Sequence, residues 1–212
     1  AALAPAILLD NARHVLRNRQ SRFFMLLAAI AMVAIVTIIA GLPRLYEANF
    51  GVAGALFAIL FGLHGVGIIV GQVLNHRLIG RIGAVASAFV ASLIMSAACL
   101  AVVLLSATGT AGPYSVSAAM FVFAIGYLIV FSNATALTLE PHGAIAGFAS
   151  SFFGFFAQVV SSAIGTVAVA LAGTSITTWS LLLLAVSLGC LLALLGWQRD
   201  AAALSPLSRK EP

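Results

Sequence analysis

Charged side chains are scarce in this sequence. Asp, Glu, Lys and Arg together make up 7% of its 212 residues, whereas 63% are hydrophobic. An average soluble domain carries roughly 25% charged residues, since water solvates most of its surface. The shortage excludes an ordinary soluble fold, and the mean hydropathy of +1.18 makes lipid the expected solvent for most of the chain.

Carboxylates are the rarest charges, and none lies at the centre of a long apolar run. A proton pump usually relies on carboxylates inside the membrane. If this protein uses a proton gradient, we therefore expect the proton-carrying carboxylate outside these 212 residues. The five acidic residues are Asp10, Glu47, Glu140, Asp200 and Glu211.

Cysteine is almost absent as well. Cys99 and Cys190 lie in different apolar runs, without the spacings typical of zinc sites or disulfide frameworks. We expect two buried, free thiols, no metal site and no cofactor. The chain begins with Ala, and residues 1–9 lack the basic start of a signal peptide, so we interpret the sequence as a fragment.

Long apolar runs, in contrast, are abundant. A helix needs about 20 apolar residues to cross the hydrocarbon core of a membrane, and six runs meet this length. The sequence therefore predicts an all-α membrane protein with six transmembrane helices, a cytoplasmic linker at 1–22 and a cytoplasmic tail at 198–212. In the linker, Leu8, Ala12 and Val15 repeat at helical spacing, which fits either an amphipathic surface helix or an unstructured basic segment. The predicted spans cover 23–43, 53–74, 84–106, 114–138, 143–171 and 177–197.

The basic residues indicate how these spans are oriented. With the N-terminus in the cytoplasm, nine of the ten basic residues lie inside and only Arg44 lies outside. Because cytoplasmic loops carry an excess of Lys and Arg, we expect both termini in the cytoplasm. The net charge of +5 is then a topology signal, and no nucleic-acid partner is expected. The inner residues are Arg13, Arg17, Arg19, Arg22, Arg77, Arg81, Arg199, Arg209 and Lys210.

Small residues form a stripe along the run at 143–171. In lipid, small side chains at this spacing let helix backbones approach closely, so static packing is one interpretation. A sliding surface that lines a substrate path is the other, and the mid-span amide of Gln158 favours it, since such a group needs partners in protein or water. The stripe consists of Gly143, Gly147, Ser150, Gly154, Gln158, Ser161 and Gly165.

Two further polar groups lie inside predicted spans. His64 shares a helix face with Gly71 and Asn75, and it is either a packing residue or a proton sensor. Asn133 lies within two turns of Tyr127 and Phe131. Aromatic faces with an amide suit either a large apolar ligand or an ordinary helix interface.

A weak repeat relates the first three spans to the last three. Two three-helix units in one membrane have opposite orientations, and inverted repeats of this kind are typical of transporters. The matches, each 92 positions apart, pair Gly51, Phe61 and Gly62 with Gly143, Phe153 and Gly154.

Several of these residues resemble a known family. The segment from Asn133 to Gln158 and the basic loop from Leu78 to Gly83 resemble the C-terminal six helices of the major facilitator superfamily. More narrowly they resemble its bicyclomycin and chloramphenicol resistance family of drug exporters. That family more often has a neutral amide where His64 stands. The loop motif comprises Arg77, Gly80, Arg81 and Gly83.

The resemblance implies half of a twelve-helix transporter, built from two inverted three-helix repeats. It implies proton-driven efflux of drug-like molecules, by alternating access, across the bacterial inner membrane. The partners would be a missing N-terminal six-helix half, the lipid bilayer and a small-molecule substrate. The candidate substrate-pathway residues are Gln158, Asn133, Tyr127, Phe131, His64, Ser150 and Gly154.

Two other functions compete with this prediction. A free-standing six-helix protein could act as a homodimeric transporter or channel. An intramembrane enzyme would need a nucleophile with a base in reach. Ser150 and Ser151 lack the G-x-S-x-G pattern, and His64 and His142 are predicted at different depths, so we expect no enzyme.

Overall fold

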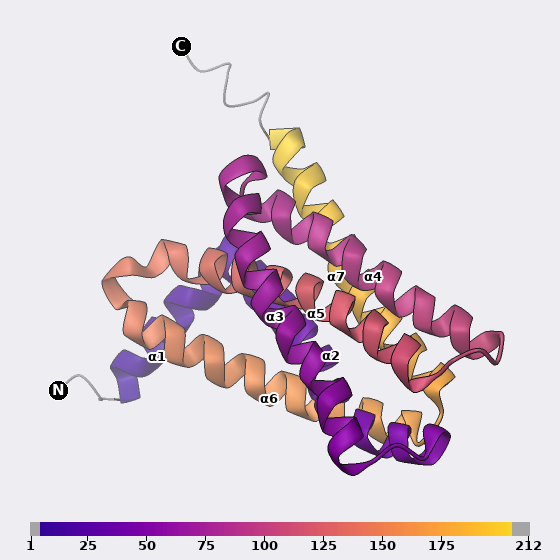
Figure 1. The fold of residues 1–212 in the computed structure, drawn as a ribbon. Coiled ribbons are helices and arrows are strands. Elements are labelled where there is room, and N and C mark those ends of the chain that lie inside the picture. The colour runs from indigo at the N-terminus through magenta and orange to yellow at the C-terminus, as the bar shows by residue number, and fades with distance from the viewer. Residues whose placement is uncertain (1–4, 205–212) are drawn as a thin grey trace.

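The computed structural model describes residues 5–204, which form seven α-helices and one short 3₁₀ helix, η1 (Figure 1). A short first helix precedes six long ones. Among the long helices, α5 and α6 are joined through η1 into one apolar run of 60 residues, so five uninterrupted helical runs are long and apolar enough to span a membrane. The elements are α1 (Pro5–Arg17), α2 (Arg19–Phe50), α3 (Gly54–Ile82), α4 (Ala84–Ala107), α5 (Pro113–Leu139), η1 (Glu140–Ile145), α6 (Ala146–Ala172) and α7 (Ile176–Leu204).

The 60-residue run bends at η1. His142 has a non-helical backbone, with φ −117° and ψ 31°, and the chain reverses there so that α6 returns along the bundle (Figure 1). Six long apolar helices therefore result, and the chain is an all-α, multi-pass membrane protein, as its composition predicts.

Helix α2 is longer than the predicted span at 23–43. It begins after Asn18, whose side-chain oxygen accepts a hydrogen bond from the Ser21 backbone N–H, and it ends at Gly51 in the left-handed conformation. Pro43 lies inside the helix without ending it. Proline removes one backbone hydrogen bond, yet the helix continues, with Leu42 and Leu45 buried on either side.

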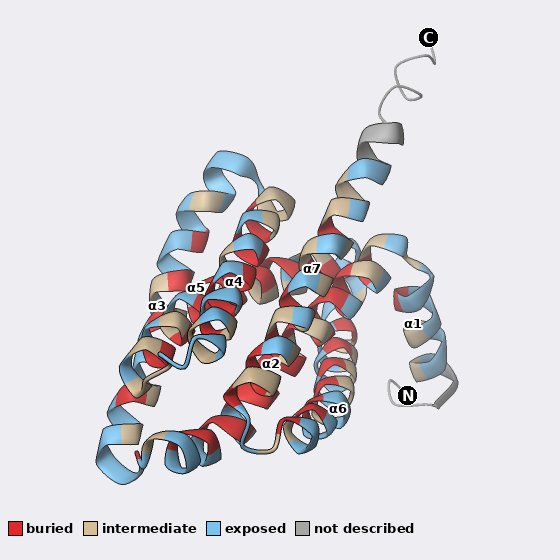
Figure 2. Ribbon diagram, turned by 90° about the vertical axis from the view of Figure 1, so that its right-hand side faces the viewer, coloured by how far each residue is buried: buried red, intermediate tan, exposed pale blue. Residues whose placement is uncertain are grey.

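The bundle is arranged around α2 and α5, which pack against each other. Helix α3 packs against α5 and α6 packs against α2, while α4 and α7 pack together behind this central pair (Figures 1 and 2). Exchanging α2–α4 with α5–α7 reproduces the main neighbours of each helix. Helices α6 and α7 also begin 92 residues after α3 and α4, which is the spacing of the sequence repeat.

The two ends of the bundle differ in charge. One end holds α1, the start of α2, the α3–α4 turn, η1 and the end of α7 (Figure 1). The opposite end holds the other three connections and Arg44. Arg209 and Lys210 lie outside the described residues. The first end carries Arg13, Arg17, Arg19, Arg22, Arg77, Arg81 and Arg199, and is called the basic end below.

Candidate functional site

The interface between α3 and α5 contains three buried polar side chains, those of His64, Asn75 and Asn133. Helix α3 contacts α5 along one stripe, and its two glycines bring the backbones together. A Cβ atom on Gly67 would lie 2.5 Å from the Phe121 carbonyl oxygen, and one on Gly71 would lie 2.8 Å from that of Ile125. The stripe consists of Leu60, His64, Gly67, Gly71 and Asn75.

His64 is buried in this interface, with 4% of its surface exposed. Its Nδ1 lies 3.2 Å from the Met120 carbonyl oxygen. Because a carbonyl oxygen can only accept, Nδ1 carries a hydrogen and donates this hydrogen bond. Its Nε2 is buried and has no hydrogen-bond partner among residues 5–204. This nitrogen is an acceptor that a water molecule or a ligand could use.

Asn75 and Asn133 join α3 to α5 between His64 and the basic end of the bundle. The Asn133 amide nitrogen donates to the Asn75 side-chain oxygen at 2.6 Å and to the Ile129 carbonyl oxygen at 2.7 Å. The Asn133 side-chain oxygen is buried without a partner in the described part of the chain. The sequence predicts Asn133 as a candidate pathway residue and gives Asn75 no such role, although Asn75 shares the stripe of His64 and Gly71.

Aromatic rings form a continuous ladder along this interface. His64 is stacked between Phe61 of α3 and Phe123 of α5, with centroid distances of 6.1 and 6.5 Å. The ladder extends along α5 through Tyr127 and Phe131. It then reaches α6, where the Phe131 and Phe153 centroids are 6.3 Å apart.

The ladder brings four predicted pathway residues into one region. His64, Tyr127, Phe131 and Asn133 all lie in or beside the α3–α5 interface. The sequence indicates Phe61 and Phe153 only as matches of the repeat. Phe61 stacks on His64 and Phe153 lies against Phe131, and the contact of Phe153 with α5 depends on which helices are neighbours. Aromatic faces with a few hydrogen-bonding groups are the usual lining of sites for apolar ligands.

The small-residue stripe of α6 is divided between two environments. Ser161 and Gly165 are buried, and a Cβ on Gly165 would lie 2.7 Å from a Val36 methyl carbon of α2. Gly147, Ser150 and Gly154 are exposed instead, and no atom lies within 4 Å of a Cβ built on either glycine. Other described helices therefore pack against the C-terminal part of the stripe, at Ser161 and Gly165, and leave its N-terminal part open.

Gln158 lies at the middle of α6 and is exposed. Its amide nitrogen donates to the Ser162 hydroxyl at 2.9 Å, on the same helix. The structure records no hydrogen bond from Gln158 or Ser150 to the Asn133 region within residues 5–204. The seven candidate residues therefore form two groups, one in the α3–α5 interface and one on the open face of α6, linked through Phe153.

The loop motif forms the turn between α3 and α4. Gly83 adopts φ 79° and its backbone N–H donates to the Ile79 carbonyl, which ends α3. Arg77, Gly80 and Arg81 are exposed, and neither arginine forms an ion pair with a described residue. The motif thus presents two free guanidinium groups at the basic end.

A second histidine cluster lies at η1. His142 is buried, its Nε2 lies 2.8 Å from the Ser21 hydroxyl oxygen of α2, and its ring meets His14 of α1 edge to face at 5.4 Å. Burial and the neighbouring His14 lower the pKa of His142. The sequence places His142 in a loop and, as a possible catalytic base, at a different depth from His64, and nothing in its local pattern reveals the contact with α1.

The described residues contain few other metal-ligating, nucleophilic or acidic groups. No group of three His, Cys, Asp or Glu side chains could hold a metal ion there. Cys99 and Cys190 are buried and free. Glu47, Glu140 and Asp200 lie near helix ends, so no described carboxylate lies at mid-span.

Comparisons with known proteins point to a transporter. No protein-family model matches the chain. Over 127 residues, which cover 58% of this chain, it is 29% identical to YdgK of Bacillus subtilis (strain 168), an uncharacterised transporter of the major facilitator type. The match covers 31% of the length of YdgK. Together with the long apolar helices, this similarity supports a membrane transporter of the major facilitator type.

Proposed function

We propose that this chain is the C-terminal half of a secondary active transporter that exports drug-like small molecules by alternating access. The proton gradient would supply the energy. The protein would lie in the inner membrane of a bacterium, with both termini in the cytoplasm and with the basic end facing inward.

This proposal depends mainly on the open face of α6, which is formed by Gly147, Ser150, Gly154 and Gln158. An exposed amide at mid-span is costly in contact with lipid tails, because the hydrocarbon offers it no hydrogen bonds. Gln158 lies on such a face, beside Gly154 and close to Ser150. A face of this kind suits a water-filled path or a second bundle that closes over it.

The aromatic ladder supports the class of substrate. Rings from α3, α5 and α6 stack in one row, in which Phe61 and Phe131 are partly exposed and the other rings are buried. The unpartnered atoms of His64 and Asn133 both accept hydrogen bonds. An apolar, partly aromatic molecule with one or two donor groups would match this lining.

A second six-helix bundle would complete the cavity. The missing N-terminal half fills this role in our proposal, and it would also hold the carboxylate that carries the proton, since no described carboxylate lies at mid-span. A second copy of this chain is the competing occupant.

The decisive experiment measures export by the full protein that contains this chain. Gln158→Leu should leave insertion intact and reduce export of some substrates at least tenfold, because an interaction that orients the substrate is worth about 1.4 kcal/mol or more. Ser162→Ala is the matched control, since it removes only the partner of Gln158 within α6. An unchanged resistance profile for Gln158→Leu would demote this residue to packing.

The occupant of the open face can be tested separately. Cysteine crosslinking from Gly154→Cys in native membranes should join this bundle to the N-terminal half of the same chain. Crosslinked pairs of identical bundles would favour the homodimer instead.

A further inference from the structure

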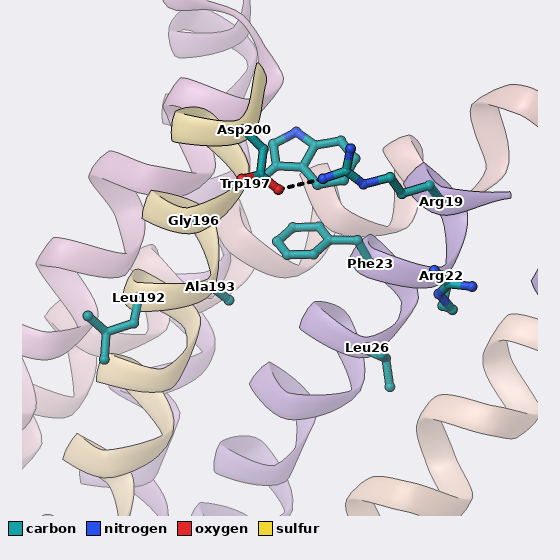
Figure 3. Close-up of a pocket in the computed structure, with 9 residues that line it drawn as sticks. All are labelled: Arg19, Arg22, Phe23, Leu26, Leu192, Ala193, Gly196, Trp197 and Asp200. Atoms are coloured by element: carbon teal, nitrogen blue, oxygen red, sulfur yellow. Dashed lines mark hydrogen bonds and ion pairs between the residues drawn. The ribbon is translucent and has the colours of Figure 1, made fainter. Parts of the chain in front are cut away.

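A groove opens between the start of α2 and the end of α7, away from the aromatic ladder (Figure 3). Its volume is about 360 Å³. It lies at the basic end of the bundle, where the two helices meet the surface of the membrane. In the view of Figure 3 the upper part of the groove holds charged side chains, those of Arg19, Arg22 and Asp200. The lower part holds the apolar side chains of Leu26 and Leu192.

The upper part holds two arginines in different states. Arg19 forms an ion pair with Asp200 across the mouth of the groove, and its guanidinium lies 5.4 Å from the centre of the Trp197 ring. Arg22 lies one turn further along α2 and has no ion-pair partner among the described residues. The Arg22 guanidinium donates to the Leu16 carbonyl oxygen at 3.4 Å, so the groove has one arginine in an ion pair and, at its edge, one arginine without a described carboxylate partner.

The lower part is apolar and open to the hydrocarbon. Phe23 stacks on Trp197 with centroids 4.6 Å apart and forms the boundary between the two parts. Leu26 and Leu192 line the groove further from the charges, and they are 45% and 65% exposed. Gly196 adds an empty position, because no atom lies within 4 Å of a Cβ built on it.

We propose that this groove binds one anionic phospholipid of the leaflet at the basic end. The phosphate would lie on Arg22 and beside Arg19, at the depth marked by Trp197. One acyl chain would run over Leu26, Gly196 and Leu192.

The combination of parts identifies a lipid. Basic pockets between transmembrane helices bind phospholipid head groups, and Trp residues mark the head-group level. A free phosphate would use the arginines alone and would leave the apolar part uncovered. A zwitterionic lipid would offset Arg22 with its own cation, so the unpaired guanidinium favours a net negative head group.

Asp200 gives the site an adjustable affinity. Its carboxylate occupies Arg19 and repels an approaching phosphate. Asp200→Asn should release Arg19 and strengthen binding, whereas Arg22→Gln should weaken it. Opposite effects from two surface substitutions are difficult to obtain by misfolding.

The test uses the full protein that contains this chain, purified in detergent. Retention of dioleoylphosphatidylglycerol is measured by native mass spectrometry and compared with dioleoylphosphatidylcholine. We expect Arg22→Gln to weaken retention of phosphatidylglycerol about fivefold, the contribution of one basic residue near an anionic head group. Arg81→Gln is the matched control, since it removes one exposed charge from the same end outside the groove. Asp200→Asn should raise retention.

A steric pair tests the apolar part. Gly196→Leu places a side chain in the groove, and its Cβ has no protein atom within 4 Å, whereas Gly189→Leu makes the same change seven residues away, outside the groove and with the same open space around its Cβ. Only Gly196→Leu should lose retention. The proposal is overturned if the members of each pair behave alike, or if inorganic phosphate alone stabilises the protein as well as phosphatidylglycerol does.

Discussion

Single polar side chains in this protein differ in whether the fold satisfies them. Thr37 and Ser96 donate to carbonyls of their own helices and cost little to bury. Nε2 of His64 and the side-chain oxygen of Asn133 are buried without a partner among the described residues. An unsatisfied buried acceptor costs about 1–3 kcal/mol, so a water or substrate that donates to either atom would recover much of this free energy. Nδ1 of His142 is likewise buried without a described partner.

His142 makes a pH prediction at the same scale. Burial, and then the charge of His14, lower its pKa, so the folded protein favours the neutral imidazole. The unfolded chain takes up this proton near pH 6.5, and stability therefore falls as the pH drops through that value. The midpoint of thermal unfolding should decline from pH 7.5 to 5.5, and His142→Gln should flatten this decline.

His14→Ala is the control for the neighbouring charge. It should reduce the decline only in part, because desolvation is the larger cause of the lowered pKa. A decline of the same size in His142→Gln would show that another group titrates.

At the scale of helices, glycine acts in two different ways. On α3, Gly67 and Gly71 allow the backbone of α5 to approach directly, whereas Gly62 and Gly65 face open space. On α6, Gly165 packs against α2 while Gly147 and Gly154 do not pack against any described atom. Helix spacing is thus set by a few glycines, and the exposed ones leave room for a neighbour.

A pair of alanine substitutions separates these two uses. Gly67→Ala should destabilise the bundle by roughly 1–3 kcal/mol, because its Cβ would meet the Phe121 carbonyl oxygen and force α3 away from α5. Gly65→Ala should be neutral or slightly stabilising, since it removes only the helix penalty of glycine. Chemical unfolding in detergent measures both, and equal effects would contradict the close approach.

At the scale of the whole molecule, α3 packs on α5 and α6 packs on α2, so the two helices flank the central pair (Figure 2). Both expose many residues on the side of the bundle that faces away from α4 and α7. In the most apolar part of α3, 22% of the residues are buried, compared with 56% in α2. A second bundle placed on this side would cover both helices and the partly exposed rings of Phe61 and Phe131.

Thiol labelling distinguishes a water path from lipid on this side. The native thiols Cys99 and Cys190 are fully buried, so they should react little with a membrane-impermeant thiol reagent, and any other cysteine of the full protein is replaced by serine before the test. Ser150→Cys and Gln158→Cys should react in intact membranes. Leu93→Cys, at the middle of α4 and also exposed in the chain, should stay unlabelled. Lack of labelling at both α6 positions would argue against a water-lined path.

The sequence by itself determined the class of fold. Hydropathy is a local property, so runs of about 20 apolar residues indicate membrane helices without knowledge of their neighbours. Helical periodicity is also local, and it correctly placed His64, Gly71 and Asn75 on one buried face of α3. The continuation of α2 through Pro43 escaped this reasoning, because proline usually ends or kinks a helix and the local pattern gives no sign that this one does not.

The tertiary structure alone decided which faces are covered. The stripe of α6 has the same spacing throughout, yet Gly165 is buried and Gly154 is open, since α2 reaches only one part of it. The contacts of His142 with Ser21 and His14, 121 and 128 positions earlier, likewise arise only when η1 folds back onto α1 and α2. Periodicity describes one helix at a time, and a site shared by several helices depends on how they pack.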